Sequence, residues 1–164
     1  MRMQVSELHQ LFHLDAPTGR LTWRNDGHCH KAGIEPGWLD NRGYRRIEVG
    51  QHRYLAHHIV WAMTHGDWPP NEVDHRNNDR TNNCADNLRD ATRMQNAKNR
   101  RMNHNNKSGV KGVRYIPHAG KYQATIQADN RRMHLGMYVD IELAELVRGE
   151  AERIYFGEFR RQAA

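Results

Sequence analysis

Residues 71–99 constrain the fold more than any other part of the chain, and they read NEVDHRNNDRTNNCADNLRDATRMQNAKN. Glu72-Val73 is typical of a short strand, and a polar loop follows from Arg76 to Asp86. Asn87-Leu88-Arg89 indicates a second short strand. Thr92 and Gln95 have the spacing of a capping box, which marks the start of a helix. This order predicts a compact unit built from a strand, a loop, a second strand and a helix.

The polar residues of this stretch indicate hydrolysis of a phosphodiester. Asp74 offers an anionic oxygen and Asn96 a neutral amide oxygen, a pair that suits Mg²⁺ (or Mn²⁺) better than zinc. His75 lies next to Asp74, and it can be neutral near pH 7 and take a proton from water. The metal would polarise the phosphoryl group. Asn87 is placed either to brace the loop or to hold the imidazole in one tautomer.

The same residues resemble the HNH (His-Me finger) endonucleases of the phage and homing type. An Asn-rich loop is often only a turn, but here the order, the spacing and the flanking residues all agree with the family. The matching residues are Val73-Asp74-His75, Asp79-Arg80-Thr81-Asn82-Asn83, Asn87-Leu88-Arg89, Thr92 and Asn96. The resemblance implies His75 as the general base and Asp74 and Asn96 as metal ligands. It also makes Asn87 the middle Asn of the motif, in the catalytic set with His75, while Cys84 departs from the Arg of many relatives.

The first 70 residues predict small strands and helices that lead into this unit. We expect a helix over residues 3–14, a strand at Leu21-Thr22-Trp23, a loop over 25–42, and a hairpin from strands at 44–49 and 52–55. A helix from His57 then ends near Gly66. This region also resembles phage HNH proteins, in LFHLDAPTGRLTWR, RGYRRIEV and AHHIVWAMTHGDWP. His57 matches a His common in that family, and we expect it to brace the helix against the nuclease core.

Composition narrows the class of protein. The 164 residues suit one domain or two small ones, and a mean hydropathy of −1.00 predicts a small core. The net charge of +6 favours a polyanionic partner. Cys29 and Cys84 lack CxxC spacing, so we expect neither zinc nor a disulfide, and the reducing cytoplasm of a bacterial or phage-infected cell fits. No apolar run approaches the roughly 18 residues that a membrane span needs.

Residues 108–164 predict a second domain that follows a basic linker at residues 98–107. We expect three strands, at 110–116, 121–128 and 132–138, and then a helix from Ile141 to Phe156. The apolar side of this helix is expected to carry Leu143, Leu146, Val147 and Ile154. Alternation in the second strand separates Tyr122, Ala124, Ile126 and Ala128 from Lys121, Gln123, Thr125 and Gln127. The pattern predicts a three-stranded antiparallel sheet packed on one helix.

This second unit resembles the APETALA-type (ethylene-response-factor) DNA-binding domain of plant regulators and phage HNH endonucleases. The matching segments are Lys111-Gly112-Val113-Arg114, Tyr122-x-Ala124-x-Ile126 and Leu135-Gly136-x-Tyr138. The resemblance implies that Arg114 and Arg132 contact DNA. Thr125, Gln127 and His134 stand where plant members have Glu, Arg and Trp, so the target sequence does not carry over.

Positive charge rises where DNA is expected to lie. Residues 1–73 carry eight basic and eight acidic residues, residues 74–107 carry eight and four, and residues 108–137 carry five and one. Residues 138–164 carry four basic and six acidic residues, so the helix is acidic and the sheet is basic. We therefore expect the sheet, and not the helix, to face DNA. The expected DNA contacts are Arg89, Arg93, Lys98, Arg100, Arg101, Lys111, Arg114, Gln123, Thr125, Gln127, Arg132 and His134.

We therefore interpret the chain as an α+β protein. Residues 1–97 form an HNH nuclease domain with its ββα-metal core at about 71–99, residues 98–107 a linker, and residues 108–164 a DNA-binding domain. The expected function is a Mg²⁺-dependent endonuclease of the phage or homing type, which nicks double-stranded DNA as a monomer or cuts both strands as a homodimer. Two alternatives stay open: a non-catalytic DNA-binding regulator that uses the HNH unit as a scaffold, and a nuclease that also acts on RNA.

Overall fold

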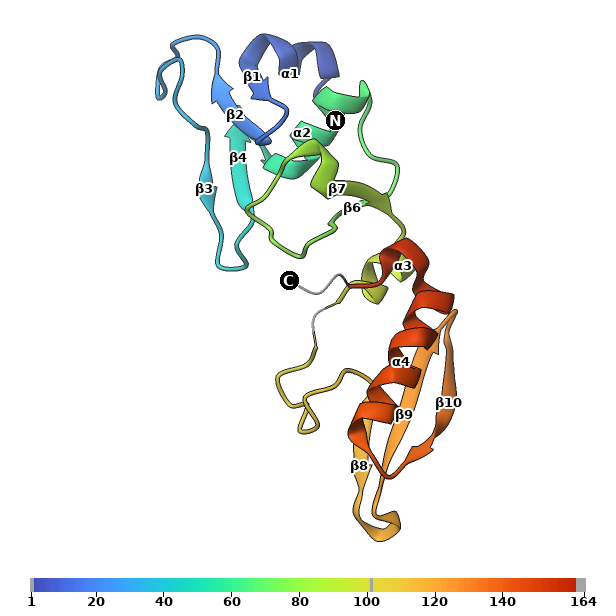
Figure 1. Ribbon diagram of the computed structural model, residues 1–164. Helices are drawn as coiled ribbons and strands as arrows, with labels where there is room; N and C mark the ends of the chain where they lie inside the picture. The colour runs from blue at the N-terminus through green and yellow to red at the C-terminus, as the bar shows by residue number, and fades with distance from the viewer. Residues whose placement is uncertain (1, 101, 162–164) are drawn as a thin grey trace. The chain divides into compact units, whose positions relative to one another are not determined.

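The computed structural model describes residues 2–100 and 102–161, and the chain divides into two compact units, Met1–Arg93 and Met94–Ala164 (Figure 1). The elements up to that division are α1 (Val5–Leu11), β1 (Phe12–Asp15), β2 (Arg20–Trp23), β3 (Trp38–Leu39), β4 (Arg45–Val49), β5 (His52–Leu55), α2 (Ala56–His65), β6 (Glu72–His75), the 3₁₀ turn η1 (Ala85–Asn87) and β7 (Leu88–Ala91). The later elements are α3 (Arg93–Lys98), β8 (Val113–Ile116), η2 (Pro117–Ala119), β9 (Lys121–Ala128), β10 (Arg131–Tyr138), α4 (Ile141–Phe156) and η3 (Gly157–Phe159). The predicted mixture of helices and small sheets is confirmed.

Helix α1 ends earlier than the sequence predicted. The apolar spacing favoured a helix to residue 14, but Phe12–Asp15 forms β1 and pairs antiparallel with β2. This pairing places Phe12 opposite Trp23, with 4.7 Å between the ring centroids, and buries Phe12 completely. Tertiary packing therefore overrides the local helical preference after Leu11.

The core of the first unit lies between its helices and its strands. β4 pairs with both β3 and β5, and the short strand β3 lies inside the segment that the sequence predicted to be only a loop. Helix α2 follows β5 directly and ends at Gly66 in the left-handed conformation (φ 80°), as predicted. The core side chains are Leu8, Phe12, Leu21, Ile47, Ala56, Ile59, Val60, Ala62, Met63, Val73 and Leu88.

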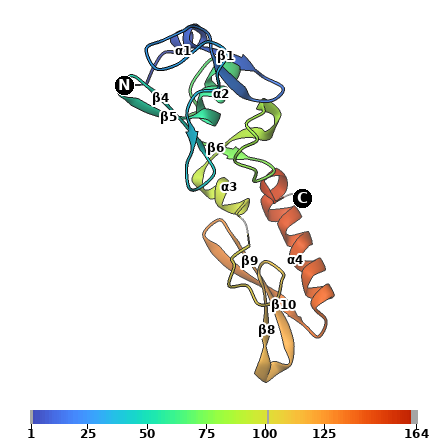
Figure 2. The same ribbon diagram turned by 90° about the vertical axis from the view of Figure 1, so that its left-hand side faces the viewer.

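The second unit contains one three-stranded antiparallel sheet in the order β10-β9-β8 (Figure 2). Asp129 and Asn130 connect β9 to β10 with positive φ angles of 48° and 61°, the backbone of a tight two-residue hairpin turn. Helix α4 runs along one face of this sheet. On that face, Ala124 packs with Ala144, and Ile126 packs with Ala151 and Phe156.

The packed face of α4 differs from the one that the sequence predicted. Ala144, Arg148, Ala151 and Phe156 are buried, whereas Leu143, Leu146 and Ile154 are 45%, 63% and 68% exposed. The prediction that these three residues pack on the sheet was wrong. Alanines on the helix meet an alanine-rich strand, so small side chains form the close contact and the larger aliphatic residues lie on the other side.

Residues 98–107, interpreted from the sequence as a basic linker, make defined contacts within the second unit. Lys98 Nζ donates to the carbonyl of Tyr155 at 3.0 Å. Lys111 Nζ donates to the carbonyls of Lys98 (3.2 Å) and Arg100 (2.8 Å). Asn106 Oδ1 accepts from the backbone N–H groups of residues 108 and 109, both at 2.9 Å. The division between the units falls before this segment, at residues 93–94.

Two truncations test which side of α4 packs. Ile126 is 1% exposed, so Ile126→Ala should lower the free energy of unfolding by about 2–5 kcal/mol. Leu146→Ala removes a side chain that is 63% exposed, so the change should stay within about 0.5 kcal/mol. Urea unfolding followed by far-UV circular dichroism measures both, and a large loss for Leu146→Ala would contradict the observed helix face.

Candidate active site

Strands β6 and β7 place the predicted catalytic residues. They pair antiparallel, with Val73 opposite Asp90, Asp74 opposite Arg89, and His75 opposite Leu88. Val73 and Leu88 belong to the hydrophobic core, and alternate side chains of a strand point to opposite faces. His75 therefore lies on the core side of this two-stranded sheet, and Asp74 lies on the other side together with Arg89.

Asp74 and Arg89 form a buried ion pair. Arg89 Nε donates to Asp74 Oδ2 at 2.9 Å and Nη2 donates to the same oxygen at 2.7 Å, and both residues are less than a tenth exposed. A buried charge whose partner is removed typically costs about 3–5 kcal/mol. Arg89 was predicted from the sequence to contact DNA, but in this structure its guanidinium is buried on the carboxylate of Asp74.

His75 is buried and bonded to the side-chain amide of Asn83. Its Nε2 lies 3.0 Å from Oδ1 of Asn83, which is itself buried. Because an amide oxygen only accepts, this contact assigns the proton of a neutral imidazole to Nε2 and the lone pair to Nδ1. Burial lowers the pKa of His75, while the Asn83 hydrogen bond and the negative charges of Asp74 and Asp79 oppose that shift. The imidazole is therefore neutral at pH 7.

Asn87 braces the loop between the two strands. Its Oδ1 accepts from the backbone N–H of Asn77 at 3.1 Å, and its Nδ2 donates to the carbonyl of Asn82 at 2.7 Å. Of the two roles considered from the sequence, these contacts match the bracing role. The side chain that contacts the imidazole is Asn83, which sequence reasoning left within the matching loop without a role of its own. No sequence signal distinguishes Asn83 from its neighbour Asn82.

Aromatic rings surround the other sides of His75. His57, on α2, makes an edge-to-face contact with His75 at a centroid distance of 4.9 Å, and Tyr44 lies at 6.1 Å. Arg80 lies over the ring of Tyr44 at 4.8 Å. Burial lowers the pKa of His57 to about 2, helped by the charges of His58 and His75. His57 is thus a neutral packing partner, in keeping with the bracing role expected for it.

Gly19, in the turn between β1 and β2, packs against the backbone of the loop between β6 and β7, at Asn83 and Cys84. A Cβ at this position would lie 2.1 Å from the carbonyl carbon and oxygen of Asn83 and 2.4 Å from the nitrogen of Cys84. Gly19 also has φ +69°, where other L-residues are strained. The turn therefore fixes the backbone of the residue that holds the imidazole, and only glycine fits.

The remaining nuclease-side residues lie at or beyond the division between the units. Arg93 and Asn96 are in α3, and Lys98 ends that helix. Asn96 belongs to the second unit and Asp74 to the first. Arg100 lies directly after α3, and Arg101 lies outside the described residues.

Six of the predicted DNA contacts gather on one face of the second sheet. Gln127 is paired with Arg132, Thr125 with His134, and Gln123 with Arg114. They belong to the alternate set that points away from the packed residues Ala124 and Ile126. Lys111 lies just before β8 and its Nζ is turned to backbone carbonyls after α3.

The donor types at Asp74 and Asn96 fit a hard cation, because a carboxylate and an amide oxygen, completed by waters, suit Mg²⁺. Within the described parts of the chain, no group of three or more His, Cys, Asp and Glu side chains is arranged to hold a metal ion.

Comparison with known proteins identifies one family. Residues 54–98 match the family model described as HNH endonuclease, a segment that includes α2, β6, the polar loop, β7 and α3. Proteins of this family are generally nucleases that use a divalent metal and act on DNA. No curated protein and no solved structure matches the chain. None of the helices in the described residues is long and apolar enough to cross a membrane.

Gly19→Ala should displace the Asn83 backbone, and Gly33→Ala provides a matched control. Gly33 has a similar φ of +79°, but no described atom lies within 4 Å of the added Cβ. Both variants should incur the cost of a left-handed alanine, and Gly19→Ala should lose more than about 1 kcal/mol beyond that. Thermal unfolding measures the loss, and the imidazole NMR signals of His75 should shift only in Gly19→Ala. Equal losses and unchanged signals would contradict the support by Gly19.

Two histidines of α2, the buried His57 and the half-buried His58, should make stability depend on pH. Burial lowers the pKa of His57 to about 2 and that of His58 to about 4, whereas both bind protons near pH 6.5 in the unfolded chain. Between pH 6 and 5 the unfolded state thus binds more protons, and each histidine should lower the free energy of unfolding by about 1.4 kcal/mol per pH unit as the pH falls.

The variant His58→Gln tests this dependence. It should reduce the slope between pH 6 and 5 by about 1.4 kcal/mol per pH unit, because it removes one of the two histidines that stay neutral in the folded state. Urea unfolding at pH 7, 6 and 5 gives the slopes for both proteins. Parallel curves would show that His58 takes up its proton in the folded state as well.

Proposed function

We propose that this chain is a divalent-metal-dependent HNH endonuclease that hydrolyses phosphodiester bonds of double-stranded DNA. The observation that carries the proposal is the setting of His75: a buried, neutral imidazole oriented by Asn83, within the segment that matches the HNH endonuclease family. A neutral imidazole in a fixed tautomer is what a general base requires.

Residues of the first unit have separate roles around His75 in this proposal. With Nε2 donating to Asn83, the lone pair on Nδ1 accepts a proton from the attacking water. The resulting imidazolium is favoured by the nearby carboxylates of Asp74 and Asp79, which raise the pKa of His75 against the effect of burial. Asn87 contributes by holding both ends of the loop that carries Asn83.

Asp74 and Asn96 are the residues that would hold the metal, with Mg²⁺ or Mn²⁺ as the preferred ion. When bound, such an ion polarises the phosphoryl group and stabilises the leaving oxygen. Arg89 fixes the orientation of the Asp74 carboxylate through two hydrogen bonds to Oδ2. Its predicted contact with a DNA phosphate requires that it leave this pair.

The second unit supplies DNA binding in this proposal. Paired strands can enter the major groove, and the face formed by Arg114, Gln123, Thr125, Gln127, Arg132 and His134 offers donors and acceptors for base edges and phosphates. The proposed DNA-binding surface also includes phosphate contacts by Arg93, Lys98, Arg100 and Arg101. One His75 site cuts one strand, so we propose a nicking enzyme of the phage or homing type as a monomer, and double-strand cleavage only by a homodimer.

A non-catalytic DNA-binding regulator is the second candidate, because one observation favours it. The carboxylate oxygen Oδ2 of Asp74 is bonded to Arg89, and Nε2 of His75 is bonded to Asn83. These contacts would equally stabilise an HNH unit used only as a scaffold. The two functions differ in whether metal-dependent cleavage depends on His75.

Supercoiled plasmid, incubated with Mg²⁺ or with EDTA, tests the proposal. The wild-type chain should produce open-circular DNA only with the metal, and His75→Ala should lower the rate about 10²–10⁴-fold because the general base is lost. Linear product would indicate action as a dimer. His13→Ala, a change at an exposed histidine of β1, should cleave like the wild type.

DNA binding by the same variants separates the two functions. A gel-shift assay in EDTA should show that His75→Ala binds DNA like the wild type. Binding without metal-dependent cleavage by any of the proteins would favour the regulator and contradict the nuclease. Cleavage that persists in His75→Ala would show that another group is the base.

A further inference from the structure

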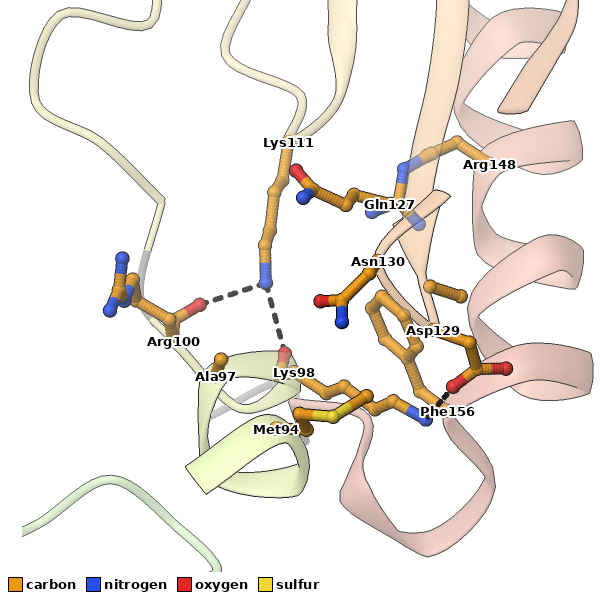
Figure 3. A pocket seen from close by; sticks show the side chains of 11 residues that line it. Met94, Ala97, Lys98, Arg100, Lys111, Gln127, Asp129, Asn130, Arg148 and Phe156 are labelled. Carbon is orange, nitrogen blue, oxygen red and sulfur yellow. Dashed lines mark hydrogen bonds and ion pairs between the residues drawn. The ribbon is translucent and has the colours of Figure 1, made fainter. Parts of the chain in front are cut away.

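A polar pocket in the second unit has no role in the proposed reaction. Its volume is about 310 Å³, at the lower end of the range for small-ligand sites. Figure 3 shows it between the end of α3, the end of β9 and α4, with Lys98, Arg100, Lys111 and Arg148 around it. The concentration of basic side chains here points to an anion.

Arg148 is the least satisfied of these groups. It is only 5% exposed, and among the described residues neither its Nε nor its Nη1 has a hydrogen-bond partner. Glu152 Oε1 lies 3.1 Å from Nη1 and forms an ion pair, but the alignment is not that of a hydrogen bond. Leaving buried donors unsatisfied costs free energy, so such a group in a folded protein requires an explanation.

The charges around the pocket leave an excess of positive charge. Lys98, Arg100, Lys111 and Arg148 contribute four positive charges, and Asp129 and Glu152 contribute two negative ones. Burial lowers the pKa of the Lys111 amine, and the nearby positive charges of Arg148 and Arg100 add to that effect. Asp129 is three-quarters exposed at the rim, where it pairs with Lys98 at 3.8 Å.

The backbone of Gly112 packs directly against the Arg148 guanidinium. A Cβ there would lie 2.3 Å from Arg148 Nε and 2.6 Å from the carbonyl oxygen of Thr125. The backbone thus passes directly against the guanidinium and carries Lys111 into the same pocket, as Figure 3 shows. Only glycine permits this close approach of the backbone to Arg148.

We propose that this pocket binds a phosphate group through Arg148 and Lys111. A buried guanidinium that lines the pocket and a neighbouring ammonium match the charge and the oxygens of a phosphate, and charge-assisted hydrogen bonds are the strong ones. A DNA backbone phosphate and a free phosphate or nucleotide share this chemistry. The site lies wholly within the second unit and does not depend on the nuclease activity.

Calorimetric titration of the full chain with inorganic phosphate, in EDTA and at constant ionic strength, tests the site. The wild type should show saturable binding, and Arg148→Met should weaken it at least tenfold. The control Arg153→Met removes an exposed arginine of the same helix, which pairs with Glu150, and should bind phosphate like the wild type. Absence of saturable binding to the wild type, or equal affinity in Arg148→Met, would overturn the proposal.

The wild type provides a second measurement that does not require the variant to fold. Addition of phosphate should shift the NMR signal of Arg148 Nε–H, because a negative charge then lies beside the guanidinium. The corresponding signal of Arg153 should remain in place. A titration that leaves the Arg148 signal unchanged would exclude phosphate from the pocket.

Binding of a labelled DNA duplex in EDTA then identifies the source of the phosphate. If the ligand is a backbone phosphate, Arg148→Met should bind DNA several-fold more weakly than Arg153→Met, and the salt dependence should decrease by about one ion. If the ligand is a free phosphate or nucleotide, the two variants should bind DNA equally while only Arg153→Met binds phosphate. The calorimetric, NMR and DNA-binding measurements do not involve cleavage. They would therefore test phosphate binding even if the chain were not a nuclease.

Discussion

The buried pair of Asp74 and Arg89 is the interaction on which the site depends. The two residues are directly opposite in β6 and β7, so their ion pair fixes the register of a sheet with only two short strands. A slip of one residue would move each side chain to the other face and leave both charges buried without partners. The register in turn places His75 on the core side, against His57, and Val73 and Leu88 in the core.

The loop between these strands is built from side-chain amides instead of apolar packing. Asn87 bonds to the backbone at Asn77 and Asn82, and Asn83 bonds to His75. An amide side chain can donate and accept hydrogen bonds, so it can satisfy loop backbone groups that no strand pairs with. The richness of this segment in Asn is thus a structural requirement, and it explains how a chain of low hydropathy can hold an imidazole rigidly.

Much of this arrangement could be predicted from the sequence, because it depends on local patterns. The β6-loop-β7 segment, the hairpin of β4 and β5, the Gly66 end of α2 and the alternating faces of β9 were all predicted. The partners of Arg89 and His75 were not, because which polar side chain reaches which depends on strand register and loop path. The prediction of which face of α4 packs on the sheet was wrong for a related reason. Hydrophobic spacing favours large apolar residues at the contact, whereas the residues that pack on this sheet include alanines.

If the second unit binds DNA as proposed, the hairpin of β9 and β10 limits how much of the sequence it could read. Its polar face runs from Gln123 to Gln127, four residue steps or roughly 13 Å of strand. Base pairs in a duplex are stacked about 3.4 Å apart, so this face covers about four of them. A target site long enough to be rare in a genome would therefore need additional DNA-contacting elements, from elsewhere in the chain or from a second copy. The length of the DNA footprint would then indicate how many such elements are bound.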